Sequence, residues 1–181
     1  MRRIIPFKLV AALFVVGGVV AALALHRSRQ SGPVEIGARA PAFSLPALGA
    51  GSVSLRDYRH KVVLVNFWAT WCPPCVQEAP SLQTFSEKMA KSGVVVIGVS
   101  VDQDAEALQK FVTQYHLSFP IARDPNQALA SHFGTFLFPE TYVLDRDGRL
   151  AEKIIGDIDW QDPRIISFVR TLAGNCDTQT P

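Results

Sequence analysis

The sequence predicts an α/β domain built on a mixed central sheet with helices on both sides. Two apolar, β-branched runs, at 61–68 and 94–101, have the pattern of central strands that are covered on both faces. Each run is followed by apolar residues at helical spacing. A later run at 140–155, with Asp147 and Gly148 at its turn, has the pattern of an antiparallel hairpin. Strands that alternate with helices and then close with a hairpin are typical of this class.

The remaining elements of the first half follow from shorter patterns. Loose alternation broken by Gly and Pro at 38–58 predicts a short N-terminal hairpin. The helix after the first central strand is expected to begin near Val76 and to end at Gly93. The apolar face of this helix comprises Ala79, Leu82, Phe85 and Met89.

Further helices are expected beyond the second central strand. Residues 119–125 have the pattern of a short strand and turn, and residues 126–133 that of a short helix. The helices on either side of this region have apolar faces that comprise Leu108, Phe111, Val112 and Tyr115 in one and Ile165, Phe168, Val169 and Leu172 in the other.

The composition disfavours several classes of function. The chain has 181 residues, of which 48% are hydrophobic, so we expect one domain with a substantial core. Its 18 basic and 16 acidic residues are spread along the chain, which disfavours nucleic-acid binding. Three cysteines are too few for a disulfide-stapled scaffold. The CxxC pair at residues 72 and 75 therefore indicates chemistry rather than framework.

The N-terminus has the pattern of a membrane-targeting signal. Residues 1–8 are basic, and an uncharged apolar run of 17 residues follows at 9–25, near the lower limit of about 17–25 for a transmembrane helix. A cleaved signal peptide is the alternative, because a small-residue motif stands at 22–24. The length of the run, with Arg27 and Arg29 directly after it, favours an uncleaved single-pass anchor.

Both alternatives send the rest of the chain across the membrane, because the basic residues before the apolar run favour a cytoplasmic N-terminus. Residues 26–37 lack periodicity and contain Ser, Gly and Pro, so we expect a linker there. The folded domain is expected at 38–174 and a short tail at 175–181.

Cys72 and Cys75 stand in the turn between the first central strand and its helix. Unpaired N–H groups and the helix dipole stabilise an anion there, so we expect Cys72 to ionise nearer neutral pH than a free thiol, whose pKa is about 8.5. Their i,i+3 spacing places both sulfurs on one side of the helix, where a small ring can close reversibly. Pro73 and Pro74 suit the first helical turn, where a missing N–H costs little.

A zinc site and a purely structural disulfide are the alternatives for this pair. Zinc needs further ligands, and neither Cys176 nor any of the four histidines stands at ligand-pair spacing. A bridge across two intervening residues closes a loop too small to remove much chain entropy. Redox chemistry explains the pair best, and we expect no metal or other cofactor.

Three motifs resemble those of membrane-anchored thioredoxin-like proteins of the TlpA, ResA and CcmG type: VVLVNFWATWCPPCVQEAP, APAFSLPAL and FPETYVLDRDGRL. The resemblance covers about residues 36–172. It implies a thioredoxin fold with an N-terminal hairpin and a central insertion, here at about residues 104–122. It also implies thiol–disulfide exchange at a bacterial inner membrane, on the periplasmic or outer side, often on cysteines of apocytochrome c or of copper sites.

The resemblance assigns roles to individual residues. Cys72 becomes the nucleophile and Cys75 the resolving thiol. Pro139 matches a cis-proline that faces the dithiol, which would leave the Phe138 main chain free to pair with a substrate strand. Without the resemblance, the sequence favours a cis peptide bond at Pro139 no more than an ordinary proline at the start of a strand. The flank expected to meet the substrate comprises Trp71, Pro73, Pro74, Phe138 and Pro139.

Glu78 stands one turn after Cys75, so its carboxylate is placed to relay a proton to or from that thiol. An acid at this position occurs in the family. The alternative is a solvated glutamate that interacts favourably with the helix dipole. Asn66 stands where cytosolic thioredoxins carry a buried acid, which leaves proton transfer to Glu78 or to solvent. A hydrogen bond in the core is the alternative role for Asn66.

The remaining candidates carry less information. His60, His116 and His132 are scattered, and we expect them to be structural or exposed. Trp160 is expected to pack over the last helix rather than to form a ligand platform. Cys176 has no local partner and is interpreted as a bystander.

The expected function is reduction of protein disulfides by dithiol exchange in a monomeric protein. In an oxidising compartment the electrons must come from elsewhere, so a membrane dithiol carrier of the DsbD or CcdA kind is the implied partner. Three alternatives stay open: an oxidant of the same fold, a thiol peroxidase, and copper delivery through Cys72 and Cys75.

Overall fold

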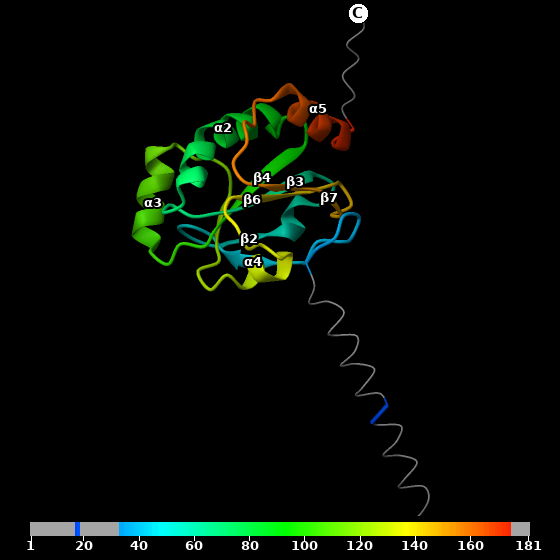
Figure 1. The fold of residues 1–181 in the computed structure, drawn as a ribbon, viewed down its shortest axis with the longest axis horizontal. Helices are drawn as coiled ribbons and strands as arrows, with labels where there is room; N and C mark the ends of the chain where they lie inside the picture. Colours follow the sequence, from blue (N-terminus) through cyan, green and yellow to red (C-terminus); the bar gives the residue numbers. More distant parts are fainter. Residues whose placement is uncertain (1–16, 19–32, 175–181) are drawn as a thin grey trace, which may run out of the picture. The chain divides into compact units, whose positions relative to one another are not determined.

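The computed structural model describes residues 17–18 and 33–174, and Figure 1 shows the fold. The predicted anchor at 9–25 lies outside the described residues except for 17–18, and so does Cys176 in the tail. Within the described part of the chain, no helix is both long enough and apolar enough to cross a bilayer.

Five strands form the central sheet in the order β5-β4-β3-β6-β7. The strands β3, β4 and β5 are parallel to one another, whereas β6 is antiparallel to β3 and β7 is antiparallel to β6. The bounds of the strands are Val62–Trp68 for β3, Val94–Ser100 for β4, Ile121–Arg123 for β5, Glu140–Leu144 for β6 and Leu150–Ile155 for β7. The predicted mixed sheet is confirmed, as is the hairpin with its turn at Gly148, whose φ of 73° is a conformation that glycine adopts readily.

Four α-helices and a short 3-10 helix accompany the sheet. Their bounds are Pro73–Ala90 for α2, Ala105–Gln114 for α3, Ala128–Phe133 for α4, Pro163–Leu172 for α5 and Leu55–Tyr58 for the 3-10 helix η1. In Figure 1, α2 and α5 lie on one side of the sheet and α4 lies on the other. Because both faces are covered, all seven residues of β3 are buried, as their continuous apolar pattern predicts.

The predicted N-terminal hairpin is confirmed and lies against one edge of the sheet. It consists of β1 (Ser44–Pro46) and β2 (Ser52–Ser54), which pair antiparallel. The chain between them forms an isolated bridge between Ala47 and Ala122 of β5, so the hairpin covers the edge strand. The region expected as an insertion, 104–122, contains α3 and leads into β5.

Successive residues of β3 face opposite sides of the sheet. Phe67 packs against Phe133 of α4, with ring centroids 5.3 Å apart, whereas Trp68 packs against Phe111 of α3, with centroids 5.1 Å apart. Asn66 faces the same side as Trp68 and lies under α2. The side chain of Asn66, near the end of β3, therefore contacts the helix that begins with the dithiol.

The predicted apolar face of the last helix needs one correction. Val169 is fully buried as expected, but the isoleucine in the core is Ile166, and Ile165 is only partly buried. Both are apolar and adjacent, so the sequence pattern could not decide which of the two faces inward. Ile166 therefore joins the four predicted residues, all of which pack against the core.

Candidate active site at the start of helix α2

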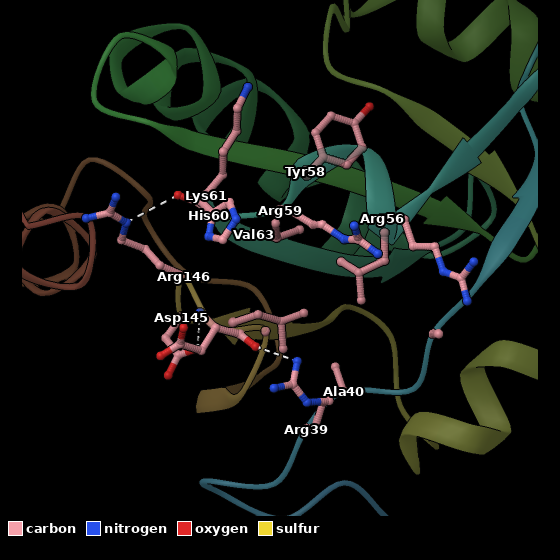
Figure 2. A pocket seen from close by; sticks show the side chains of 15 residues that line it. Arg39, Ala40, Arg56, Tyr58, Arg59, His60, Lys61, Val63, Asp145 and Arg146 are labelled. Carbon is pink, nitrogen blue, oxygen red and sulfur yellow. Dashed lines mark hydrogen bonds between the residues drawn. The ribbon is translucent and has the colours of Figure 1, made fainter.

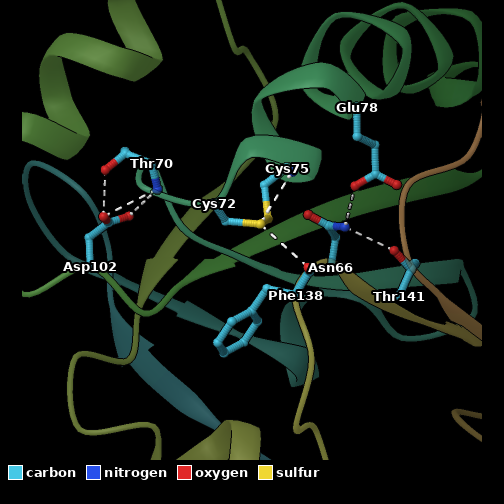
Figure 3. Close-up of a disulfide and its surroundings, with 8 residues drawn as sticks. All are labelled: Asn66, Thr70, Cys72, Cys75, Glu78, Asp102, Phe138 and Thr141. Atoms are coloured by element: carbon cyan, nitrogen blue, oxygen red, sulfur yellow. Dashed lines mark hydrogen bonds between the residues drawn. A yellow bond between two sulfur atoms is a disulfide. The ribbon is translucent and has the colours of Figure 1, made fainter.

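Cys72 and Cys75 form a disulfide at the N-terminus of α2, with their Cα atoms 5.3 Å apart (Figure 3). Cys72 is the N-cap residue, and its Sγ accepts a hydrogen bond from the main-chain N–H of Cys75 at 3.3 Å. The first two helical positions are Pro73 and Pro74, which have no N–H. The N–H of Cys75 is therefore the first helical donor that the sulfur of Cys72 meets.

The turn that carries the dithiol is held by Asp102, a buried residue that follows β4. The main-chain N–H of Thr70 donates to both carboxylate oxygens of Asp102, at 3.2 and 3.0 Å, and the Thr70 hydroxyl donates to Oδ1 at 2.6 Å. Ser100 donates to Oδ2 at 2.8 Å. These hydrogen bonds converge on one buried side chain, so the chain two residues before Cys72 is fixed in place.

A segment before β6 faces the dithiol. The Phe138–Pro139 peptide bond is cis, as the resemblance implies. The carbonyl oxygen of Phe138 lies 3.4 Å from the Sγ of Cys72, and Figure 3 shows the two pointing toward each other. Trp71 meets the Phe138 ring edge to face, with centroids 6.1 Å apart. The structure thus brings together the nucleophile and both aromatic residues predicted to flank it.

The surroundings of the disulfide are apolar and exposed, although the sulfurs themselves are not. Cys72 and Cys75 are only 5% and 2% exposed, whereas Trp71 is 63% exposed. Two residues that the sequence analysis did not select, Phe136 and Leu137, are 80% and 63% exposed just before the cis bond. Large apolar side chains rarely lie together in solvent without a binding role, and their position next to a matched cis-proline is the signal that could have identified them.

Glu78 is buried beneath the dithiol, with only 3% of its surface exposed, so the alternative of a solvated glutamate is wrong. Its Oε1 accepts a hydrogen bond from Trp160 Nε1 at 2.7 Å, and its Oε2 accepts one from Asn66 Nδ2 at 3.1 Å. Asn66 also donates to the hydroxyl of Thr141 at 2.9 Å (Figure 3). Two strands, β3 and β6, and the loop before α5 therefore fix one carboxyl group.

Trp160 differs from its predicted role. It is fully buried, as a packing residue must be, but the ring contact that the structure gives it is with Phe85 of α2, with centroids 5.2 Å apart. Its indole N–H binds Glu78 as well. Trp160 is thus part of the site, which the sequence analysis missed because the two residues are 82 positions apart.

Burial raises the pKa of Glu78 from 4.5 to about 7, because desolvation disfavours the charged carboxylate. Hydrogen bonds from Trp160, Asn66 and the main chain of Ile158 act in the opposite direction and lower this pKa, and the charge of Asp157 raises it slightly. The carboxyl group can therefore both accept and release a proton near neutral pH, as a general acid or base must.

We expect the stability of the oxidised full chain to fall as the pH rises from about 4.5 to about 7. In this range Glu78 keeps its proton when folded but loses it when unfolded, so the folded state binds more protons. The shift corresponds to a loss of about 3 kcal/mol from this group, which is complete once the pH has risen through the folded pKa of about 7. Denaturant unfolding between pH 4 and 8 measures the free energy of unfolding of wild type and of Glu78→Gln. If the difference between these two free energies did not depend on pH, the prediction would be contradicted.

A small cavity of about 10 Å³ connects the acid to the resolving cysteine. Glu78, Cys75 and Trp68 all line it. The indole N–H of Trp68 is buried and has no hydrogen-bond partner among the described residues. The space is close to what one water molecule needs, and such a molecule would have a donor in Trp68 and an acceptor in Glu78.

The three histidines do not contribute to this site. His60, His116 and His132 are all exposed, as expected, and none lies among the groups that contact the dithiol. Within residues 33–174, no group of three or more His, Cys, Asp or Glu side chains is close enough to hold a metal ion.

The fold and the dithiol together define a thiol–disulfide oxidoreductase with a thioredoxin fold. A reactive cysteine pair opens a helix, faces a cis-proline and lies above a buried acid with a pKa near neutrality. Residues 35–166 match the family described as Redoxin, and the chain belongs to this family.

Individual relatives confirm the resemblance to ResA-type proteins. The chain is 33% identical over 151 residues to the thiol-disulfide oxidoreductase ResA of Bacillus thuringiensis (strain Al Hakam), which covers 83% of this chain and 87% of the relative. A DsbE-like thiol:disulfide interchange protein from Chlorobium tepidum superposes with a TM-score of 0.73 at 28% identity, over 78% of this chain and 99% of that one. A secreted thiol-disulfide isomerase from Corynebacterium glutamicum gives a TM-score of 0.69 at 28% identity, over 75% and 85%.

Proposed function

We propose that this protein reduces disulfides of other proteins on the outer side of a bacterial inner membrane. The observation that carries the direction of electron flow is the burial of Glu78 next to Cys75. A strongly oxidising dithiol requires a reduced form that is stabilised, usually as a thiolate. A carboxylate close to the sulfurs opposes a second negative charge there, so it works against an oxidant and favours a reductant.

The start of α2 also favours electron flow from the dithiol to the substrate. Pro73 and Pro74 remove two of the N–H groups that a helix N-terminus otherwise offers to an anion. A single helical N–H, that of Cys75, contacts the sulfur of Cys72. The thiolate is therefore stabilised less than at an N-terminus with all its donors free, which keeps the dithiol a ready electron donor.

The reaction begins when the Cys72 thiolate attacks one sulfur of the substrate disulfide. A mixed disulfide forms, and the other substrate sulfur leaves as a thiolate. Cys75 then loses its proton to Glu78, directly or through a water molecule in the small cavity. The Cys75 thiolate attacks the sulfur of Cys72, which closes the disulfide and releases the second substrate thiolate. Two electrons have moved from the protein to the substrate.

The substrate is expected to bind across the exposed apolar surface around the dithiol. Trp71, Phe136 and Leu137 offer contact area for the residues that flank a substrate cysteine. The main chain of Phe138, which lies beside Cys72, is placed to pair with an extended peptide. Cysteines of apocytochrome c or of copper sites are the substrates that the family suggests.

The N-terminal sequence supports a location for the domain, and that location suggests which partner would reduce the oxidised dithiol again. The apolar run at 9–25 would anchor the chain with its domain outside the cytoplasm. The Corynebacterium glutamicum relative is described as secreted, which agrees with an extracytoplasmic role. An oxidised domain there needs electrons from across the membrane, and a dithiol carrier of the DsbD or CcdA kind would supply them. A shared membrane raises the effective concentration of the two partners.

The reduction potential of the Cys72–Cys75 pair tests the direction. We expect a value well below about −200 mV when the full chain is equilibrated with glutathione or dithiothreitol redox buffers. Glu78→Gln should raise the potential, because it removes the carboxylate that opposes the thiolate. A wild-type value near about −120 mV would identify an oxidant and overturn the proposal.

A further inference from the structure

A cleft lined by basic side chains lies at the end of the domain opposite the dithiol. We call it the basic cleft, and its volume is about 380 Å³. Five cations line it: Arg39, Arg56, Arg59, Lys61 and Arg146. They come from three separate segments, namely the chain before β1, the region of η1 and the turn after β6, and Figure 2 shows them around the hollow.

The floor of the basic cleft is apolar. Val63 of β3 and Leu144 of β6, which are paired in the sheet, line it together with Ala40 and Leu55. A hollow with walls of low dielectric and an excess of charge of one sign concentrates the electrostatic field within it. The five cations therefore attract an anion more strongly than the same charges would on a flat surface.

Three of the cations have no partner in the described part of the chain. The side chains of Arg56, Arg59 and Lys61 make no hydrogen bond or ion pair there. The other two bind only neutral main-chain carbonyls: Arg39 donates to Asp147 at 2.8 Å, and Arg146 donates to His60 at 3.2 Å (Figure 2). These two bonds hold their guanidinium groups at the rim without neutralising them.

The carboxylates near the basic cleft do not cancel its charge. Only Asp145 and Asp147 line it, which leaves a net charge of +3 on the lining, whereas the whole chain carries +2. Asp145 is already engaged, because its Oδ1 accepts the main-chain N–H groups of Asp147 and Arg149 at 2.9 and 2.8 Å. The lining of the basic cleft therefore keeps an excess of positive charge.

We propose that the basic cleft binds a phosphate group, of the kind that an anionic phospholipid headgroup presents. Four of its five cations are arginines, whose planar guanidinium groups match the oxygens of phosphate in a bidentate manner. Like charges gathered in one hollow repel one another, and a bound anion removes that repulsion. A phosphate group, with several oxygens and at least one negative charge, satisfies more than one guanidinium at once.

The position of the basic cleft favours a lipid as the source of the phosphate. Arg39, at its rim, is 14 residues after Leu25, the end of the predicted anchor, and a chain of this length spans at most roughly 50 Å. An anchor at 9–25 would therefore keep the cleft within reach of the bilayer. The strands β3 and β6 run from the cleft to the dithiol, so a domain held by this end presents Cys72 away from the membrane.

Inorganic phosphate is the first probe. The full chain in maltoside detergent is titrated with phosphate at constant ionic strength, and amide chemical shifts are followed by NMR. We expect saturable shifts at 56–61 and 145–149, and binding at least tenfold weaker in the double variant Arg56→Gln/Arg59→Gln. The matched control Lys110→Gln/Arg164→Gln removes two exposed cations elsewhere and should bind within twofold of wild type. If no chemical shift changed saturably, or if both double variants bound phosphate equally weakly, the proposed phosphate site would be overturned.

Lipid discs identify the source. The full chain is placed in nanodiscs of phosphatidylcholine alone or with phosphatidylglycerol, and hydrogen exchange is measured. We expect protection of 56–61 and 145–149 only with phosphatidylglycerol, lost in Arg56→Gln/Arg59→Gln but not in the control. Binding of inorganic phosphate without protection in either disc overturns the lipid as the source and leaves a site for free phosphate. The double variant should reduce insulin at the wild-type rate, so the outcome is independent of the proposed redox function.

Discussion

Cys72→Ser is expected to lower insulin reduction by the full chain to the rate of dithiothreitol alone. Cys72 is the sulfur that lies at the helix N-terminus and faces the Phe138 carbonyl, so among residues 33–174 it is the thiol placed to begin the exchange. The protein should still fold, because the disulfide closes a loop of only two intervening residues and contributes little chain entropy. Far-UV circular dichroism and the unfolding midpoint check this point.

Cys75→Ser should give a different defect. The first attack remains possible, but the mixed disulfide cannot be resolved, so substrate proteins stay bound through Cys72 and can be identified after capture from cells. Cys176→Ser, which removes the third thiol, should leave the reduction rate unchanged. If Cys72→Ser captured partners and Cys75→Ser did not, the assigned roles of the two cysteines would have to be exchanged.

Glu78→Gln is expected to slow resolution of the mixed disulfide by about 100-fold at pH 7, the lower end of the usual contribution of a general base. The wild-type resolution rate should rise through pH 7, the pKa of the buried carboxyl group. In the variant the rise should move toward pH 8.5, roughly where an unassisted thiol ionises. Stopped-flow fluorescence of single turnovers separates this step from the first attack.

Glu87→Gln is the matched control, because Glu87 is an exposed residue of the same helix and the chemical substitution is the same. It should keep the wild-type rate and pH profile. A merely structural role for Glu78 would slow both steps of exchange without moving the pH profile. That outcome would assign deprotonation of Cys75 to solvent.

The parts of the fold that local pattern determines were predictable from the sequence. The apolar runs of β3 and β4, the turn at Gly148 and the prolines at the start of α2 all obey rules that involve neighbouring residues. The cis bond at Pro139 was not determined by its neighbours alone, and the family resemblance decided it. The dithiol and the acid of Glu78 were found because they share one helix.

Contacts across the fold were not predictable in the same way. Asp102 reaches Thr70 only because β3 and β4 lie side by side in parallel, so their carboxyl ends meet at one edge. A polar residue directly after a buried strand was the available signal for it. Trp160 reaches Glu78 across 82 positions, and no local pattern links them.

The basic cleft is a second feature that could not be predicted from the sequence, because it lies between segments that are far apart along the chain. Its arginines are spread from position 39 to position 146, so the sequence alone does not show that they lie together. Only the pairing of β3 with β6, and the bridge between Arg39 and Arg149, bring these segments together. The spread of charge along the chain disfavours nucleic-acid binding, but it does not reveal how the charges are arranged in space.

The pairing of β3 with β6 also separates the turn at 145–149 from the reactive sulfur. Five paired residues along these strands, at about 3.3 Å each, correspond to roughly 16 Å of rigid spacing. A fluorescent protein or an electrode linker grafted onto this turn would stay clear of an incoming disulfide. The domain could then be immobilised or imaged while it continues to exchange electrons.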